Sequence, residues 1–413
     1  MKIDQYYGNG RSNGGFSLYG ILSVVFVFVL LIQLCRSMAI DTFGLTGTRL
    51  DLAGFAICHA IGAALIARAV ISRRLMADVL LLCVLLISYI ATVVANTAID
   101  TSLLAMFLSR YGILNWLLLG VGTAAAASYI HLPIASPQAR LQKRLFLSIT
   151  VIVGIILTLF SATYLSYPVF SLSYQSVANN LILILLILMI FTQVIWGGKV
   201  PIPVVVGLLV IGTLAVTAVA RMQSTSIVGF WMVGLLVYFW AALSKLTLKY
   251  KIIAFASLSF VAIIYLKSDL FTQTLESTRF AVLLGGGGLS SLDGRLELMS
   301  DFGRQFAVGP VFGHFSAEVM AGSGIGNYPH SLLSFLTHTG LVGTALLCVV
   351  LFLSYSRRFP VRRLSQPDVQ QLMFMSAILA LGTAYTFMTW SVFWFMLGFM
   401  CKMPIPKAAG EAR

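Results

Sequence analysis

His330 is the residue of this sequence whose type and position best fit catalysis. It follows Pro329, which suits the first turn of a helix, and it precedes a long apolar run. Ser334, Thr337 and, more obliquely, His338 follow it on roughly the same helical face, and polar residues in a membrane helix usually face a bundle interior or a water-filled cavity. We therefore favour a general base or acceptor-binding group over a histidine that only anchors the helix.

Arg295 is the second candidate, because of its place on a predicted amphipathic helix at residues 291–307. At about 100° per residue, charged Glu297, Asp301 and Arg304 lie on a solvated face. The opposite arc holds Leu292, Leu296, Met299, Phe302, Gly303 and Phe306. Arg295 falls inside that apolar arc, where a charge is costly unless it meets an anion. It either snorkels or pairs within the protein, or it binds an anionic ligand, which we favour.

The sequence predicts neither a metal site nor a cofactor. The five cysteines lie inside or at the ends of apolar runs without CxxC spacing, and no His, Cys and carboxylate cluster has the spacing of a divalent-metal site. The carboxylates Asp293, Glu297 and Asp301 follow one solvated helix face, which argues against a catalytic acid pair.

The composition of the sequence indicates whether water or lipid surrounds the elements that position these residues. Of 413 residues, 59% are hydrophobic and only 10% are charged, whereas soluble domains carry roughly 25% charged residues. Lipid therefore covers most of the surface. The net charge of +14 comes from Lys and Arg in short loops, a pattern of membrane orientation rather than of nucleic-acid binding.

The fold class predicted is all-α, a polytopic membrane protein of about twelve transmembrane helices. Spanning roughly 30 Å of hydrocarbon takes about 20 helical residues, and backbone groups in lipid must be satisfied within the segment. The last two spans could be one bent element, which makes eleven the alternative count. The predicted spans are 16–35, 50–71, 75–96, 111–130, 144–164, 176–196, 200–220, 226–243, 251–267, 330–355, 371–387 and 389–402.

The distribution of basic residues predicts the orientation. With both termini in the cytoplasm, 18 Lys and Arg residues lie inside and 8 outside, as the positive-inside rule requires. The chain then divides into helices 1–9 (1–267), a long periplasmic loop (268–329), helices 10–12 (330–402) and a cytoplasmic tail (403–413). The loop holds six of the thirteen acidic residues, and loops of this length are often functional. Gly340 and Gly343 in helix 10 predict close approach of another helix.

Two stretches of this sequence resemble a known family. Residues 293–313, DGRLELMSDFGRQFAVGPVFG, are similar to the arginine-led amphipathic segment of the bacterial O-antigen ligases and O-antigen or exopolysaccharide polymerases. Residues 328–343, YPHSLLSFLTHTGLVG, resemble that family's histidine motif, with Ser331 where Asn is commoner. The layout of helices and outer loop is also similar. The resemblance implies a helical, GT-C-like glycosyltransferase that needs no metal, in the bacterial inner membrane.

The resemblance also implies roles for individual residues. His330 would serve the attacking acceptor hydroxyl at the periplasmic face, and Arg295 would bind the diphosphate of an undecaprenyl-diphosphate-linked glycan donor. Arg279 is implied by loop position alone, and Arg221 is shifted by more than a helical turn from the family's Ser-Arg pair. Arginines can stabilise a leaving diphosphate without a metal. The implied partners are a glycan or lipid A-core acceptor, membrane lipids, a flippase and chain-length regulators; nucleic acid is not among them.

Alternatives remain at this point. A polymerase and a ligase share the donor and differ in acceptor, and the compact outer loop favours the polymerase. A transporter or lipid-linked oligosaccharide flippase also fits twelve helices, with His59 and Arg68 as candidates near the midplane. A scaffold without catalytic activity would leave the pattern of Arg295 and His330 unexplained.

Overall fold

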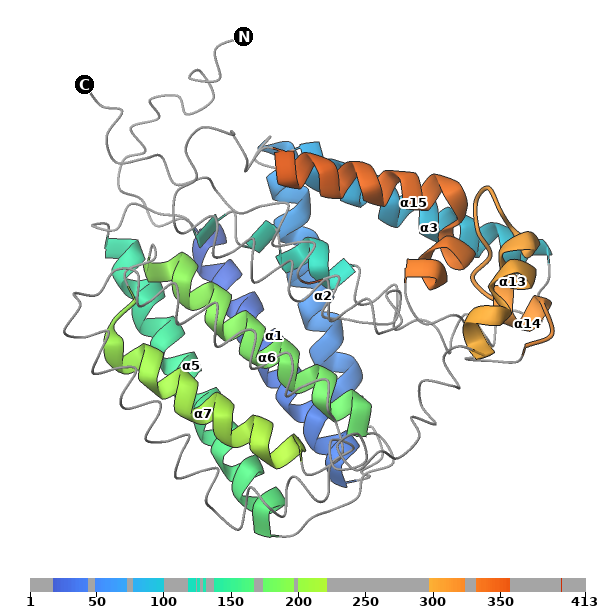
Figure 1. The fold of residues 1–413 in the computed structure, drawn as a ribbon. Coiled ribbons are helices and arrows are strands. Elements are labelled where there is room, and N and C mark those ends of the chain that lie inside the picture. The colour runs from blue at the N-terminus through green and yellow to red at the C-terminus, as the bar shows by residue number, and fades with distance from the viewer. Residues whose placement is uncertain are drawn as a thin grey trace.

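The structure of this chain is a computed structural model. It describes residues 18–43, 49–72, 77–99, 137–166, 174–196, 200–220, 297–323 and 332–356, with short stretches within 118–130 and residue 395. Within these residues the secondary structure is helical and no strand occurs (Figure 1). The all-α class predicted from the sequence is confirmed for this part of the chain.

In the described part of the chain, seven long helices and two short ones have defined bounds. They are α1 (Leu18–Phe43), α2 (Arg49–Ile71), α3 (Ala77–Ile99), α5 (Pro137–Ser166), α6 (Tyr174–Trp196), α7 (Ile202–Ala220), α13 (Phe302–Val308), α14 (Ala317–Met320) and α15 (Leu332–Ser356). The long helices follow the predicted spans closely, although α1 continues about two turns beyond its predicted end and α5 begins about two turns before its predicted start. The predicted spans at 226–243, 251–267, 371–387 and 389–402 lie outside the described residues, apart from residue 395.

Among the residues that the structure describes, four stretches of helix are long and apolar enough to cross a membrane: Leu18–Ile40, Ala53–Ile71, Ala139–Thr163 and Leu333–Leu353. Shorter apolar stretches occur in the other long helices, at Cys83–Asn96, Val177–Met189 and Pro203–Ala218. A helix needs about 20 apolar residues to cross the hydrocarbon. These lengths support a membrane protein, as composition predicts.

Helix α6 forms the centre of the larger helical group. Every residue from 181 to 188 is at most 2% exposed, and a helix that is apolar and covered all round belongs in a core. It packs on α1, while α1 also contacts α2 and α5, and α5 contacts α7 (Figure 1).

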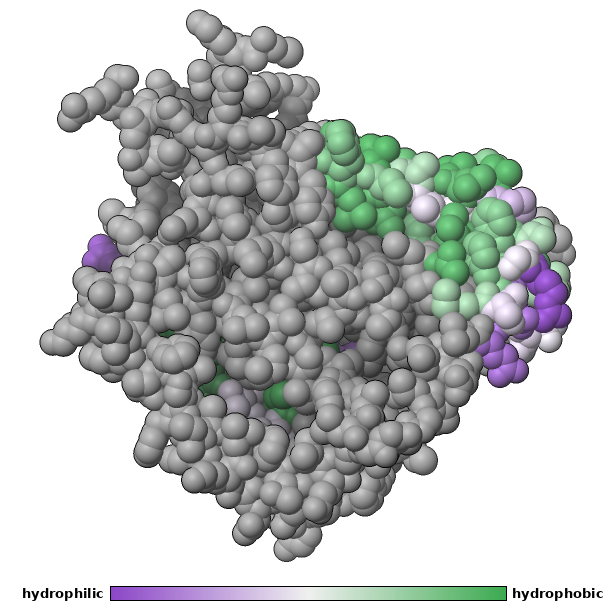
Figure 2. All heavy atoms as spheres, in the orientation of Figure 1, coloured by the Kyte–Doolittle hydropathy of each residue, from purple (hydrophilic) through white to green (hydrophobic). Residues whose placement is uncertain are grey.

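Helix α15 belongs to a second group, which positions the candidate site. It lies beside α3, and α13 packs on it and on α14 (Figure 1). Figure 2 shows an apolar surface over this group that becomes hydrophilic at α13 and α14. Leu341, Val349 and Phe352 are exposed on the apolar side, whereas Glu297 and Arg304 are exposed on the hydrophilic side. We call residues 297–323, which include α13 and α14, the docked segment.

Candidate functional site

Helix α15 is broken at Gly340. This residue has φ 64° and ψ −169°, so α15 consists of two half-helices, 332–339 and 341–356. A break leaves N–H and C=O groups without partners inside the helix. In a membrane-spanning stretch those groups need partners from elsewhere in the protein.

A turn of the docked segment, residues 309–314, supplies these partners. The amides of Leu341 and Val342 donate to the carbonyls of Pro310 and Val311, each at 3.0 Å. The amide of His314 donates to the carbonyl of Thr337, also at 3.0 Å. The turn is thus bonded to both half-helices, and the docked segment is fixed to α15 by its backbone.

Two glycines allow this close approach. A Cβ on Gly313, whose φ is 79°, would lie 2.3 Å from the carbonyl oxygen of His338. A Cβ on Gly340 would lie 2.4 Å from the amide nitrogen of Gly313 and the carbonyl oxygen of Val311. Both positions therefore need glycine, for conformation and for space. The sequence predicted that Gly340 admits a neighbouring helix; the structure corrects this, because a turn fills that space.

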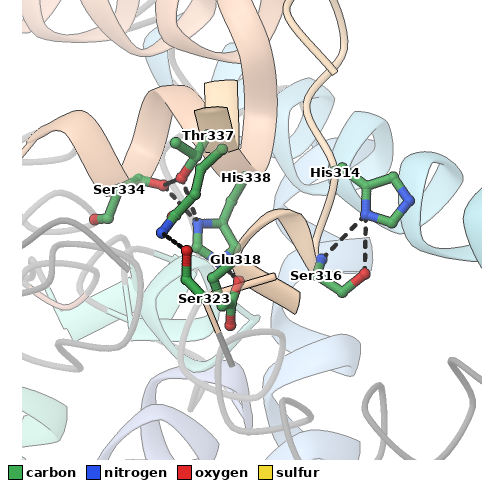
Figure 3. A network of polar contacts seen from close by, with 8 residues as sticks. His314, Ser316, Glu318, Ser323, Ser334, Thr337 and His338 are labelled. Atoms are coloured by element: carbon green, nitrogen blue, oxygen red, sulfur yellow. Dashed lines mark hydrogen bonds and ion pairs between the residues drawn. The ribbon is translucent and has the colours of Figure 1, made fainter. Parts of the chain in front are cut away.

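A buried pair of ionisable residues lies beside this contact (Figure 3). Glu318 on α14 is 0% exposed and His338 on α15 is 1% exposed, with His338 Nε2 3.8 Å from Glu318 Oε2. The other ring nitrogen, Nδ1, lies 2.6 Å from the carbonyl oxygen of Ser334 and 3.2 Å from Thr337 Oγ1. The pair joins the docked segment to the first half-helix through side chains.

A second polar network joins the two ends of the docked segment to each other. Asp301 accepts hydrogen bonds from Arg304 and, at 3.0 Å, from Ser323 Oγ. Gln305 Nε2 donates to the same serine at 3.3 Å. The hydrogen bond from Arg304 and then that from Ser323 hold the pKa of Asp301 below its ordinary value. Residues 301 and 323 therefore lie side by side.

His314 forms a local contact on the other side of the turn (Figure 3). Its Nδ1 accepts from the Ser316 amide at 3.3 Å, and Ser316 Oγ lies 2.9 Å away. The imidazole stacks on Phe315, and burial lowers the pKa of His314. His314 is thus neutral at neutral pH, with Nδ1 as the acceptor.

A cavity of about 430 Å³ lies between α3 and the break in α15. Ser88, Thr92 and Asn96 line it from α3, and Gly313 and Val342 line it from the break. The hydroxyls of Ser88 and Thr92 donate to carbonyls of their own helix, so toward a ligand their oxygens can act as acceptors. The cavity can hold a largely apolar group with a few hydrogen-bonding atoms.

The four predicted site residues lie outside the described part of the chain. They are His330, Arg295, Arg279 and Arg221. The described elements begin or end next to three of them: α15 starts two residues after His330, the helical stretch at 297–300 starts two residues after Arg295, and α7 ends at Ala220. Their assignments stay predictions.

The amphipathic helix at 291–307 agrees with the structure only in part. Its described portion is helical at 297–300 and in α13, with a turn at Asp301 between them. Glu297 and Arg304 are exposed, as predicted. On the apolar arc, however, Met299 is 40% exposed and Phe302 and Phe306, which stack on each other, are half-buried. The fully buried residue of α13 is the polar Gln305, whose side-chain amide donates to Ser323.

Sequence reasoning missed the pairing of Glu318 with His338 and the role of His314. The i, i+4 spacing of Ser334 and His338 could indicate only the contact of the imidazole with the serine carbonyl, not its partner on α14. Among the residues described, no group of three or more His, Cys, Asp or Glu side chains is arranged to hold a metal ion.

No family model, curated protein or solved structure matches this chain.

Proposed function

We propose that this chain is a membrane glycosyltransferase that moves a glycan from undecaprenyl diphosphate to an acceptor hydroxyl at the periplasmic face. The observation that carries the proposal is the closure of the docked segment. Asp301, one helical turn after the first residue of the segment, is hydrogen-bonded to Ser323, its last residue, so the two ends of the segment lie near each other. The arginine is six residues before Asp301, and the histidine is seven residues after Ser323. An anion-binding group and a general base can therefore serve one site.

The proposed topology has twelve spans, with both termini in the cytoplasm of a bacterial cell and the docked segment on the periplasmic side of its inner membrane. The 18-to-8 distribution of basic residues supports the orientation. The agreement of α1, α2, α3, α5, α6, α7 and α15 with predicted spans supports the use of hydropathy for the remaining ones.

The proposed reaction is a displacement at the anomeric carbon of the donor glycan. The acceptor oxygen forms a bond to that carbon, the bond from carbon to phosphate oxygen breaks, and undecaprenyl diphosphate leaves. His330 takes the proton of the acceptor hydroxyl, a task that suits an imidazole near neutral pH. Arg295, with Arg279 and Arg221 as further candidates, stabilises the charge that develops on the diphosphate.

A polymerase, which extends another glycan, is preferred to a ligase, which transfers to lipid A-core. The glycan phenotype of a deletion separates the two. Loss of a polymerase leaves single repeat units on lipid A-core, whereas loss of a ligase leaves long chains on the lipid carrier and a bare core.

A transporter is the second candidate, and the break in α15 is the observation that favours it. Transporters place substrate sites on interrupted helices, where free backbone groups bind the substrate. Here Leu341, Val342 and Thr337 bond to the chain's own turn instead. These backbone groups at the break are thus bonded to the protein itself rather than to a substrate, which favours the transferase. Movement of lipid-linked glycan across proteoliposomes without transfer would support the transporter.

Substitution of Arg295 tests the proposed donor site. Guanidinium can bind phosphate oxygens through two parallel hydrogen bonds, whereas ammonium acts as a point charge. Arg295→Lys is expected to lower the transfer rate and donor affinity by roughly 10-fold or more although the charge is unchanged, and Arg295→Ala to lower them further. The measurement is transfer from lipid-linked donor by purified variants at matched concentration.

The controls are Glu297→Ala and Arg304→Ala on the exposed face. Glu297 is exposed, and the ion pair of Arg304 with Asp301 lies at the surface, where such pairs contribute about 0–1 kcal/mol, so both variants are expected to stay near wild-type activity. Equal and small effects in all four variants would show that Arg295 is an ordinary surface charge that does not bind the donor.

A further inference from the structure

The cavity between α3 and the break in α15 is set in apolar parts of both helices. Its walls belong to the apolar stretches Cys83–Asn96 of α3 and Leu333–Leu353 of α15, together with the turn at 309–314. On α3 the apolar side chains next to the cavity are open, with Ile87 64% and Val94 62% exposed. In a membrane protein lipid covers such side chains, so a ligand of this cavity comes from the bilayer.

Asn96 lines this cavity with an amide group that lacks a hydrogen bond. Its buried Nδ2 has no partner among the residues that the structure describes. By contrast, the hydroxyls of Ser88, Thr92 and Thr339 donate to carbonyls of their own helices. An unpaired amide is costly in apolar surroundings. Rotation about the broad χ2 torsion of asparagine can turn an N–H group into the cavity, so Asn96 can donate to an acceptor there.

The lining contributed by α3 follows the depth of one membrane leaflet. Ser88 is the middle residue of α3, and Asn96 lies three residues before its end. The two residues lie about 12 Å apart along the helix at 1.5 Å per residue. One leaflet contributes about half of the roughly 30 Å of hydrocarbon. A chain that lies along this side of α3 therefore runs from the membrane surface toward the midplane.

The cavity matches a neutral ligand. No charged residue occurs among the described residues that line it, so a phosphate group there would lack a cation, which is costly. An ester carbonyl is neutral and accepts hydrogen bonds. The volume of about 430 Å³ lies in the range of small-molecule sites, about 300–1,000 Å³. The ligand that fits is an apolar chain with a neutral acceptor at one end.

From these features we infer that the cavity binds one acyl chain of a membrane glycerophospholipid, and that Asn96 donates to the carbonyl oxygen of the ester that joins this chain to glycerol. The ester lies at the surface end of the hydrocarbon, level with Asn96, and the chain extends toward Ser88. The bound chain contacts Phe312 and Gly313 of the turn and Val342 of α15, so it supports the docked segment on the side of α3. This inference needs only a membrane location and does not rest on the proposed function.

Native mass spectrometry of the purified full chain in detergent tests the hydrogen bond. The probes are dioleoyl phosphatidylethanolamine, whose chains are ester-linked, and its analogue with ether-linked chains of the same length. An ether oxygen is a weaker acceptor than a carbonyl oxygen, so the wild type is expected to bind the ester lipid about 5-fold more tightly, the effect of one hydrogen bond. Asn96→Leu, which has no N–H in its side chain, is expected to bind both lipids equally. Equal affinities in the wild type would overturn the inference.

Ala91→Phe tests the cavity itself. Ala91 is an exposed residue of the lining, and a ring there fills the space of the chain, so this variant is expected to lose one bound lipid together with the preference for the ester. The matched control is Ala63→Phe, the same change at an exposed residue of α2, which is expected to keep both. Hydrogen exchange of the α6 amides, in the other helical group, is the folding control and is expected to be equal in all variants.

An Ala91→Phe protein that folds and keeps the lipid with its ester preference would overturn the site. If neither Ala91→Phe nor Asn96→Leu folds, the comparison of the two lipids on the wild type decides alone.

Competition separates the phospholipid from an isoprenoid lipid, which carries a chain without an ester. Undecaprenyl diphosphate is expected to displace isotope-labelled phospholipid from the wild type only at higher concentration than the unlabelled ester lipid does. Displacement at lower concentration would overturn the phospholipid as the occupant. None of these measurements requires glycan transfer, so failure of the proposed function would leave their outcome unchanged.

Discussion

His314 and Asp301 make the docked segment sensitive to acid in two separate pH windows. Burial lowers the pKa of His314, so the unfolded chain binds its proton more readily and stability falls as pH drops below the ordinary value of 6.5. Hydrogen bonds from Arg304 and Ser323 lower the pKa of Asp301. Its contribution is complete above the ordinary value of 3.8 and is lost as pH falls through the lowered pKa.

Substitution of His314 by Asn is expected to remove the first of these effects and to keep the turn. Asn can accept from an amide two residues ahead, as His314 Nδ1 does from Ser316, but it does not titrate. His314→Ala lacks the acceptor, so it is expected to raise exchange of the Ser316 amide about 5-fold, corresponding to about 1 kcal/mol.

The measurement is the protection factor of that amide between pH 7.5 and 5. The wild type is expected to lose protection over this range, and His314→Asn to lose less. An equal loss in both proteins would show that another group causes the acid sensitivity.

The sequence could predict candidate residues only where spacing along one element was sufficient. Arg295 stood out because it interrupts an apolar arc, and His330 because it follows Pro329 at a predicted span. Glu318 and His338 are 20 residues apart on two different helices, α14 and α15, and they meet only because the docked segment packs on α15. No periodicity encodes that contact, so Glu318 resembled any other acid of the outer loop.

At the scale of elements, the break in α15 is the feature that hydropathy could not predict. Apolar residues continue on both sides of Gly340, so the sequence predicts one continuous span at 330–355, close to the observed Leu332–Ser356. The break depends on the turn at 309–314, which replaces the lost helical hydrogen bonds. A glycine in a membrane helix more commonly indicates helix packing, and that expectation was wrong for Gly340.

Gly313→Ala is expected to displace the turn. It is expected to lower the free energy of unfolding by clearly more than a positive φ alone costs an alanine. The new Cβ would overlap the backbone of His338, which cannot move without disturbing α15. Gly322→Ala is the matched control. It has nearly the same φ, 80°, but its Cβ would meet nothing within 4 Å, so a loss of about 1 kcal/mol is expected.

The measurement is thermal stability of the two variants in the same detergent. Gly313→Ala should lower the apparent Tm clearly more than Gly322→Ala. Equal shifts would mean that the docked segment does not approach α15 as closely as the structure has it.

At the scale of the whole molecule, hydropathy predicted the long helices and their bounds to within one or two turns, but not their arrangement. Helices α3 and α15 pack together although they are more than 200 residues apart in the sequence. On α3 the side toward α15 carries Ser88, Thr92 and Asn96, whereas Val84, Ile87 and Val94 are exposed. This pattern distinguishes the packed side of α3, but it does not identify α15 as the helix that packs there. The burial of α6 on all sides is likewise a property of the assembled group.

The account's central claim is that this assembly positions His330 as the base of a glycan transfer. The most direct measurement is transfer from an undecaprenyl-diphosphate-linked oligosaccharide by purified wild type and His330→Ala in lipid. Protection of the Leu341 and Val342 amides serves as the folding control, and it is expected to be equal in both proteins. We predict that the wild type transfers glycan and that the variant is slower by about 10²–10⁴-fold. No transfer by the folded wild type, or near-wild-type turnover by His330→Ala, would contradict the claim.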